Sequence, residues 1–430
     1  MEDKPGGTPA RRLRDAVEWD VARRLAYALA RPGRVVSRGL SDADGCVLGT
    51  PLVAPVAVPA VDRSAMDGYA VRGNGPWRIV GHIAAGVADP GALEDGEATG
   101  IVTGATLPAG TTSVVRSEDA VVTSNRLERP AKDAVVSGDR LEGPAEDAVV
   151  GGDWLEGPAG GGRHIRRAGE ECEPGDQLLP AGVIVTPAVL GLAATVGLNR
   201  LTVVPPPTVA ALITGDELVH RGPSSPGRVR DAIGPMLPGL ITRAGARNGP
   251  LTHLRDDRDR LVEALKETEA DLILVSGSSA AGPADHLRAV LTDLDAQMVV
   301  DGVACRPGHP QALAQLPDGR LVLGLPGNPH AALVAFLTLG VAAITRMRGL
   351  ALPTLANVAV PGGITCHPTN TRLVPVRLTP QGAVPVGHDG AAMLRGPAVA
   401  DALAVVAPGP SEAIAARLLP IDPGARPWIL

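Results

Sequence analysis

The stretch Asp271-Leu272-Ile273-Leu274-Val275-Ser276-Gly277-Ser278 joins a short apolar run to a loop of small residues that continues to Gly282. Apolar runs of this length that end in glycine are typical of buried strands in a parallel sheet. A helix is expected to begin near Pro283. Residues 208–213 and 320–325 have the same character, and each run is also followed by a glycine-containing loop.

Helical segments are expected between and after these strands, at residues 234–246, 257–268 and 331–344. The alternation of strands and helices predicts an α/β domain with a doubly wound parallel sheet at 207–352. After Pro353 the chain returns to short strands and turns, which predicts a small C-terminal β-domain at 353–430.

A chain of 430 residues is long enough for two to four domains. Residues 13–30 place apolar side chains at helical spacing between charges, which predicts an amphipathic helix. A short second helix is expected to begin at Ser41. Residues 51–163 contain short β-like runs separated by glycine and proline, which predicts a separate β-rich domain.

A 14-residue repeat occurs three times at 119–160, with Asp-Ala-Val-Val beginning at Asp119, Asp133 and Asp147. The period is shorter than that of the common solenoids. Tandem duplication of one hairpin segment explains it, and the product is a long loop or β-arm. A surface insertion without function is the alternative.

The composition limits the partners and the compartment. A net charge of −6 disfavours nucleic acid as the main partner. The four cysteines have no metal-ligand spacing and indicate reduced thiols. The N-terminus has no apolar signal region, and residues 331–344 are too few to span a bilayer. A cytoplasmic protein without a membrane partner is expected.

The loops at 214–218, 276–282 and 325–329 leave predicted parallel strands at one edge, where such sheets bind ligands. Their glycines and the helices that follow them favour an anion. Carboxylates beside an anion site suggest a bridging divalent ion such as Mg²⁺. The candidate ligands are Asp216, Glu217 and Asp285, with Asp271 a weaker choice. Glu217 and Asp285 could equally be ordinary charges in a first helical turn, and Asp271 is weaker because it begins a strand.

The heptapeptide Ser64-Ala65-Met66-Asp67-Gly68-Tyr69-Ala70 is an unusual turn, because a tyrosine stands beside a carboxylate and a glycine. In company with other motifs it resembles the molybdopterin molybdenumtransferase family, which includes the gephyrin E domain. The similarity covers nearly the whole chain. The other motifs that carry the resemblance lie at 101–110, 166–170, 214–218, 276–285, 306–308 and 324–329.

The resemblance implies a homodimer of four-domain subunits in which residues 11–50 and 164–206 form an elongated linking and dimerisation domain. The implied activity is insertion of molybdate into adenylylated molybdopterin, with Mg²⁺-dependent loss of AMP. A molybdopterin adenylyltransferase is a further partner to consider.

The resemblance also assigns residues to the site. Asp67 and Thr103 would act from the partner subunit, and Glu217 and Asp285 from the α/β domain. Asp67, Glu217 and Asp285 would also hold the metal. The implied cofactor-binding residues are Thr214, Gly215, Asp216, Ser276, Gly277, Ser278, Arg288, Arg306, Gly308, His309, Pro326, Gly327 and Asn328.

The departures from the family pattern concentrate around the expected oxyanion pocket. Arg288 and His309 replace lysines, Ala331 replaces a serine, and Asp231-Ala232-Ile233 replaces Asp-Ser-Asn. Histidine makes a fixed cation titratable, and loss of a serine hydroxyl removes a donor. Three hypotheses follow: an active transferase with an altered pocket, a non-catalytic paralogue that binds or hands over molybdopterin or acts as a scaffold, and a transferase for another oxyanion such as tungstate.

Overall fold

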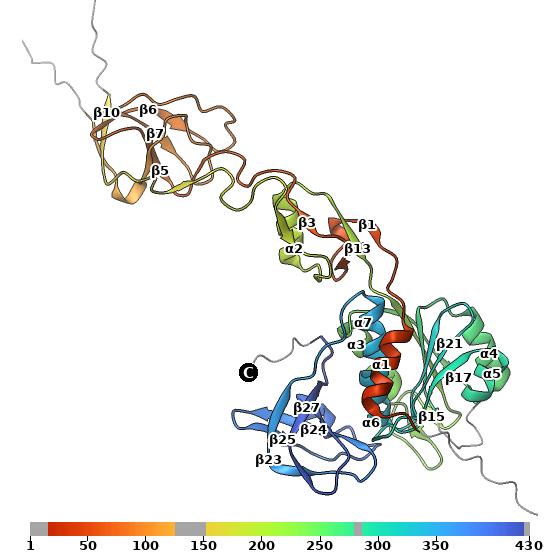
Figure 1. The fold of residues 1–430 in the computed structure, drawn as a ribbon. Helices are drawn as coiled ribbons and strands as arrows, with labels where there is room; N and C mark the ends of the chain where they lie inside the picture. Colours follow the sequence, from red (N-terminus) through yellow and green to blue (C-terminus); the bar gives the residue numbers. More distant parts are fainter. Residues whose placement is uncertain (1–15, 125–151, 279–285, 425–430) are drawn as a thin grey trace, which may run out of the picture. The chain divides into compact units, whose positions relative to one another are not determined.

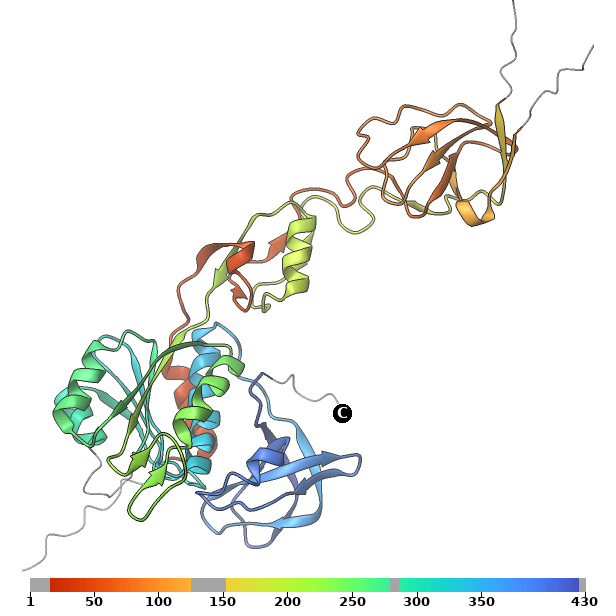
Figure 2. The same cartoon turned by 180° about the vertical axis from the view of Figure 1, so that it is seen from behind.

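A computed structural model describes residues 16–124, 152–278 and 286–424 (Figures 1 and 2). The chain divides into two compact units, one made of Met1–Thr50, Ala181–Leu190 and Arg200–Leu430, the other of Pro51–Pro180 and Gly191–Asn199. The finer four-domain division stays a prediction.

The first unit contains a six-stranded mixed sheet. Its strands, in spatial order, are β17 (Arg247–Leu254), β14 (Thr208–Thr214), β18 (Leu272–Val275), β22 (Leu321–Gly324), β21 (Ala312–Gln315) and β19 (Gln297–Asp301). The first four strands are parallel, whereas β21 is antiparallel to both of its neighbours. The predicted strands β14, β18 and β22 are parallel as expected, and the sheet as a whole is mixed because of β21, a strand that the sequence analysis did not predict. A tight turn at 316–320 joins β21 to β22, and so short a connection can join only antiparallel strands.

Helices cover both faces of this sheet, as the doubly wound prediction requires (Figure 1). Val209, Ala211 and Ile213 of β14 pack towards one face, while Ala210 and Leu212 pack towards the other. Alternate residues point to opposite faces of a strand, so an apolar run is needed when both faces are buried. The helices on the first face are α1 (Trp19–Leu29), α3 (Ile233–Arg243), α6 (Pro329–Ala335) and α7 (Val341–Met347); those on the second are α4 (Arg258–Glu267) and α5 (Leu287–Asp293).

The helix predicted at 13–30 is α1, which begins at Trp19 and ends at Leu29. The buried indole Nε1 of Trp19 donates to Thr338 Oγ1 at 3.0 Å. The predicted helix at 234–246 ends at Arg243, because Gly245 adopts φ +81° and turns the chain. The short second helix expected at Ser41 is the 3₁₀ helix η1 (Leu40–Asp42).

The predicted apolar helix at 331–344 belongs to a longer helical segment. α6, the π-helical turn η3 (Phe336–Gly340) and α7 follow one another without a break. Pro329–Met347 is the one helix of the described residues that is long and apolar enough to cross a membrane, and 89% of its most apolar window is buried within the protein. A core helix has the same properties, so this segment is weak evidence for a membrane span.

The C-terminal strands of the first unit form a second sheet (Figure 2). Its strands, in spatial order, are β20 (Cys305–Arg306), β24 (Thr371–Thr379), β26 (Ala402–Val406), β27 (Glu412–Pro420) and β23 (Asn357–Thr365). β25 (Gly382–Pro385) pairs with β24 outside this order, and the 3₁₀ helix η4 (Pro397–Val399) precedes β26 in the sequence. Cys305 and Arg306 of β20 pair with Thr371 and Arg372 of β24, and the turn that contains His309 follows directly.

The second unit is β-rich. Its main sheet has the order β8 (Ser113–Arg116), β5 (Gly68–Val71), β7 (Glu97–Ile101), β6 (Trp77–Ile83), β10 (Asp153–Glu156) and β9 (Val121–Ser124). The remaining elements of the chain are small: β1 (Val36–Gly39), β2 (Val47–Leu48), β3 (Leu52–Val53), β4 (Arg63–Ser64), η2 (Ser117–Asp119), β11 (Ile165–Arg166), β12 (Gln177–Leu179), α2 (Pro187–Thr195), β13 (Arg200–Val204), β15 (Leu218–Val219) and β16 (Val229–Arg230).

The repeat region is described only at its two ends. β9 belongs to the first copy and β10 to the third, and they pair antiparallel with Val122 opposite Leu155. The second copy lies outside the described residues, so the predicted arm stays a prediction.

Candidate functional site

Three loops of the first unit leave one edge of the sheet. β14, β18 and β22 are adjacent and parallel, so residues 214–218, 276–278 and 325–329 follow strands that end side by side. Ligands of open α/β sheets bind at this edge. By contrast, Asp271 lies at the other end of β18, where its carboxylate accepts the Thr208 N–H at 2.7 Å, and it is therefore remote from these loops.

Thr214 and Ser276 join the first two loops by two hydrogen bonds. Thr214 Oγ1 donates to the Ser276 carbonyl at 2.7 Å, and Ser276 Oγ accepts the Thr214 N–H at 3.2 Å. Gly277 follows with φ +83°, and a Cβ built there would lie 2.5 Å from Thr214 Oγ1. The close approach and the left-handed backbone both require glycine.

Arg288 connects the second loop to the turn at 306–310. Its Nη1 donates to Ser278 Oγ at 3.2 Å, its Nη2 to the Pro310 carbonyl at 3.3 Å, and its Nε to Asp301 Oδ1 at 2.6 Å. The Ser278 N–H in turn donates to the Leu325 carbonyl at 3.0 Å, which joins the third loop. One guanidinium group thus lies where the second loop and the 306–310 turn meet.

The turn at 306–310 presents Arg306 and His309. Arg306 is exposed, Gly308 is buried with φ +105°, and His309 is half-buried. His309 Nδ1 lies 2.9 Å from the Val303 carbonyl. A carbonyl can only accept, so this contact requires a proton on Nδ1 of His309.

In the third loop Pro326 is buried, whereas Gly327 and Asn328 are exposed. Asn328 occupies the residue before α6, and its side chain makes no capping hydrogen bond in the described structure. Its amide group therefore remains available to a ligand. Ala331 is 2% exposed within α6.

Asp216 and Glu217 are exposed in the first loop. The Asp216 N–H donates to Asp256 Oδ2 at 3.1 Å, and Glu217 Oε2 lies 2.8 Å from where a Cβ of Gly215 would be. The Glu217 carboxylate therefore folds back over Gly215. Asp285 lies outside the described residues.

A small pocket at this edge is lined both by site residues that the sequence analysis predicted and by residues that it did not predict. Thr214, Ser276, Gly277 and Ser278 line it together with Arg255, Asp256, Asp257, Leu261, Val275, His286 and Leu287. The Asp256-Asp257 pair follows β17, a strand that the sequence analysis did not predict. Recognition of that strand would have placed the pair at the same edge.

Asp67 and Thr103 meet in the β-rich unit. Asp67 Oδ1 accepts the Thr103 N–H at 2.6 Å and the Thr103 hydroxyl at 2.9 Å. The backbone bond and then the hydroxyl bond lower the pKa of the exposed Asp67 carboxylate, because both stabilise its charged form. Gly68 permits the turn, because a Cβ there would lie 2.0 Å from the Val115 carbonyl oxygen.

Two family models match the chain. Residues 17–197 match the MoeA N-terminal region (domain I and II), and residues 210–346 match the probable molybdopterin binding domain.

Curated relatives agree with these matches. Molybdopterin molybdenumtransferase 2 of Mycobacterium tuberculosis is 34% identical over 73% of this chain and 75% of its own length. Molybdopterin molybdenumtransferase of Staphylococcus epidermidis is 26% identical over 73% and 72%. Among solved structures, a molybdopterin biosynthesis MoeA protein of Pyrococcus horikoshii has a TM-score of 0.69 at 24% identity, with 95% of this chain and 99% of that chain covered. At this identity the likeness concerns the fold.

Proposed function

Because the chain belongs to the molybdopterin molybdenumtransferase family, we propose that it inserts molybdate into adenylylated molybdopterin with Mg²⁺-dependent release of AMP. This transferase reaction is a step of molybdenum cofactor biosynthesis. Adenylylated molybdopterin and molybdate are its substrates.

The observation that carries the proposal is the hydrogen-bonded junction of the loops at the sheet edge. The Thr214 hydroxyl donates to the Ser276 carbonyl, and the Ser278 N–H donates to the Leu325 carbonyl. The Arg288 guanidinium donates to both Ser278 Oγ and the Pro310 carbonyl. A fixed backbone of this kind can place N–H groups and a guanidinium against anionic substrates before they bind. Preorganised donors of this type stabilise charge that develops during phosphoryl chemistry.

The carboxylates suit the proposed Mg²⁺, since Asp67 and Glu217 are exposed oxygen ligands of the kind that Mg²⁺ prefers. Bound Mg²⁺ would neutralise charge on the phosphate oxygens during loss of AMP. The chain's own contribution is that Thr103 lowers the pKa of Asp67 and orients its carboxylate, while the Glu217 carboxylate lies over Gly215. Asp285 is proposed as a further ligand from the family motif alone.

The molybdate pocket is proposed to use Arg288, Arg306 and His309 as its cations. An arginine supplies a planar fork of donors where lysine supplies a point charge. Arg288 is also paired with Asp301 at 2.6 Å, which reduces the positive charge available to an oxyanion. This pairing favours the second candidate function, a non-catalytic protein that binds or hands over molybdopterin.

We further propose a cytoplasmic homodimer in which Asp67 and Thr103 of one subunit act with Glu217 and Asp285 of the other. A mixture of Asp67→Asn and Glu217→Gln subunits tests this arrangement. Each mixed dimer then contains one intact site, so an equal mixture should recover about a quarter of the wild-type activity. Recovery no greater than that of the single variants would exclude shared sites.

The activity is tested by AMP release from adenylylated molybdopterin, with molybdate and Mg²⁺ added to the purified chain. Asp67→Asn should lower kcat/KM at least about 100-fold, because it removes a charge placed for the reaction while the amide oxygen still accepts from Thr103. Asp89→Asn is the matched control, since exposed Asp89 also accepts a backbone N–H, from Gly91 at 3.1 Å.

Molybdate-dependent AMP release by the wild-type chain and its loss in Asp67→Asn are the expected results. Binding of the substrate by a folded wild-type chain without AMP release would instead identify the non-catalytic protein. Wild-type activity in Asp67→Asn would remove Asp67 from the mechanism.

A further inference from the structure

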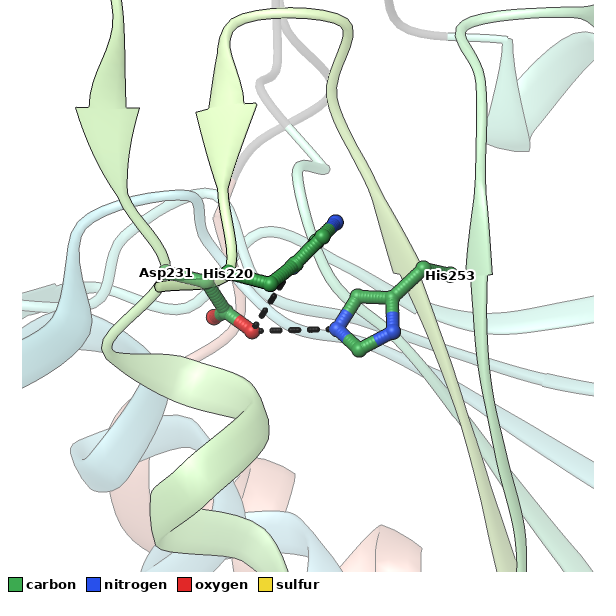
Figure 3. A group of neighbouring side chains, drawn as sticks. All are labelled: His220, Asp231 and His253. Carbon is green, nitrogen blue, oxygen red and sulfur yellow. Dashed lines mark hydrogen bonds and ion pairs between the residues drawn. The ribbon is translucent and has the colours of Figure 1, made fainter. Parts of the chain in front are cut away.

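Three side chains that are not among the assigned site residues converge in the first unit: His220, Asp231 and His253 (Figure 3). His253 Nε2 lies 3.2 Å from Asp231 Oδ2, and His220 Nδ1 lies 3.9 Å from the same oxygen. One nitrogen or oxygen atom from each side chain lies within 4.8 Å of the other two. The two imidazole rings are 3.8 Å apart between centroids and tilted by 52°.

The fold explains why these residues meet. β15 and β16 pair with Val219 opposite Arg230, so the next residues, His220 and Asp231, leave the pair side by side. His253 comes from β17, where it lies opposite Ile213 of β14. Three segments that are distant in the sequence therefore supply one side chain each.

Asp231 is held in place by the backbone. Its side chain is 5% exposed, and Oδ1 accepts the N–H groups of Ile233 and Gly234 at 3.0 and 2.9 Å, at the start of α3. The other oxygen, Oδ2, faces the two histidines. A buried carboxylate with one oxygen fixed by the backbone and the other directed at two imidazoles resembles a preformed ligand set.

The spacing suits a transition-metal ion. A tetrahedral ion with ligand bonds of about 2.0–2.1 Å separates its ligand atoms by about 3.3 Å. The His253–Asp231 distance of 3.2 Å is close to this value, and a small ring rotation of His220 shortens its 3.9 Å distance to Asp231. The histidine side chains are 49% and 36% exposed, so both can turn and an ion can enter from solvent.

The donor types select the class of ion. Two imidazoles and one carboxylate are typical ligands of Zn²⁺ and of neighbouring divalent ions, whereas Mg²⁺ prefers oxygen alone. This set therefore differs from the carboxylates proposed to hold Mg²⁺. Arg228 and Arg255 line the adjoining pocket with His220 and His253, so an anion or water is the expected fourth ligand.

We propose that His220, Asp231 and His253 form a binding site for one divalent transition-metal ion of the zinc type. Three protein ligands with a fourth position open to the pocket are the pattern of accessible metal sites, in contrast to closed structural ones. None of the three ligands is among the residues assigned to the transferase reaction, so metal binding can be tested apart from that activity, although Gly215 and Asp216 line the same adjoining pocket.

Binding of Co²⁺ alone is the test. The full chain is prepared without a histidine tag, freed of metal with a chelator and titrated with Co²⁺, with visible absorption and calorimetry as readouts. About one Co²⁺ per chain is expected, with the absorption of a four- or five-coordinate site, displaced by Zn²⁺ and not by excess Mg²⁺. His220→Gln and His253→Gln should each weaken binding at least about 10-fold.

Two further variants keep the result interpretable. Asp231→Asn retains an oxygen for the Ile233 and Gly234 N–H groups, so it should fold and yet lose Co²⁺ affinity. His388→Gln changes an exposed histidine elsewhere in the first unit and should bind Co²⁺ as the wild type does. The proposal is overturned if the wild-type chain binds no Co²⁺, or if His220→Gln and His253→Gln retain wild-type affinity. The three residues would then act only as an ion-pair cluster at the start of α3.

Discussion

Gly277→Ala provides a sharp test of the loop junction at the sheet edge. Gly277 has φ +83°, and a Cβ there would lie 2.5 Å from Thr214 Oγ1. An alanine in the left-handed region costs about 1–3 kcal/mol of folding free energy. The threonine oxygen must also move by roughly 1 Å to reach ordinary van der Waals separation. That movement breaks its hydrogen bond to the Ser276 carbonyl, which is worth about 0.5–1.5 kcal/mol.

Gly319→Ala is the matched control. Gly319 has φ +94° and lies in the turn between β21 and β22, but a Cβ there meets no atom within 4 Å. Both variants place an alanine in the left-handed region and lose folding free energy for that reason, but only Gly277→Ala also displaces the Thr214 hydroxyl. Gly277→Ala should therefore be the less stable of the two by about 1 kcal/mol in denaturant unfolding.

The activity of the two variants should differ more than their stability. A displacement of about 1 Å in a substrate-positioning loop costs about 100-fold in rate, so kcat/KM for AMP release should fall by that factor in Gly277→Ala and stay unchanged in Gly319→Ala. Thr214→Ala removes the opposing oxygen, so its effect combined with Gly277→Ala should be smaller than the sum of the single effects. Wild-type activity in Gly277→Ala, or strict additivity in the double variant, would refute the reasoning.

Three other predictions concern parts of the molecule away from the loops. Deletion of residues 119–146 leaves one Asp-Ala-Val-Val segment after the same preceding residue, so the chain should stay folded with unchanged AMP release; a loss of solubility in size-exclusion chromatography would show that the repeats are structural. Trp19→Phe leaves the buried hydroxyl of Thr338 without its indole partner and should cost about 1–3 kcal/mol in denaturant unfolding, whereas Trp154→Phe, at an exposed position, should change little. Burial lowers the pKa of His330 from 6.5. Above pH 6.5 His330 is neutral in both the folded and the unfolded chain. As the pH decreases below 6.5 the unfolded chain takes up the proton first, so the folded state loses stability until the pH reaches the lowered native pKa. His330→Gln should flatten the stability profile as the pH falls below 6.5, and an unchanged profile would contradict the assignment.

The central strands were predictable because their surroundings are uniform. After their first residues (Thr208, Asp271 and Arg320), the ranges 208–213, 271–275 and 320–325 contain only apolar residues and glycine, since β14, β18 and β22 are buried on both faces. β17 was missed because it is an edge strand with mostly exposed, polar residues and a proline at position 250. An edge strand has one neighbour and little burial, so its sequence carries a weak signal.

The candidate site was predictable in its loops and not in its contacts. Glycines after apolar runs identified the loops that contain Thr214, Ser276 and Gly327, because turn chemistry is local. The partners of Arg288 could not be predicted in this way. Asp301 and Pro310 lie 13 and 22 residues from Arg288 in sequence, and only the packing of β19 and the 306–310 turn brings them near.

The α/β class followed from the order of apolar runs, helical segments and glycine loops, because each of these signals depends on residues within one turn or strand of one another. The antiparallel course of β21 and the meeting of His220, Asp231 and His253 did not follow from that order. Both depend on which strands pair, β21 with β22 and β15 with β16, and on the place of β17 beside β14. Pairing within the six-stranded sheet is selected by burial of the whole sheet between its two layers of helices, which no short stretch of sequence contains.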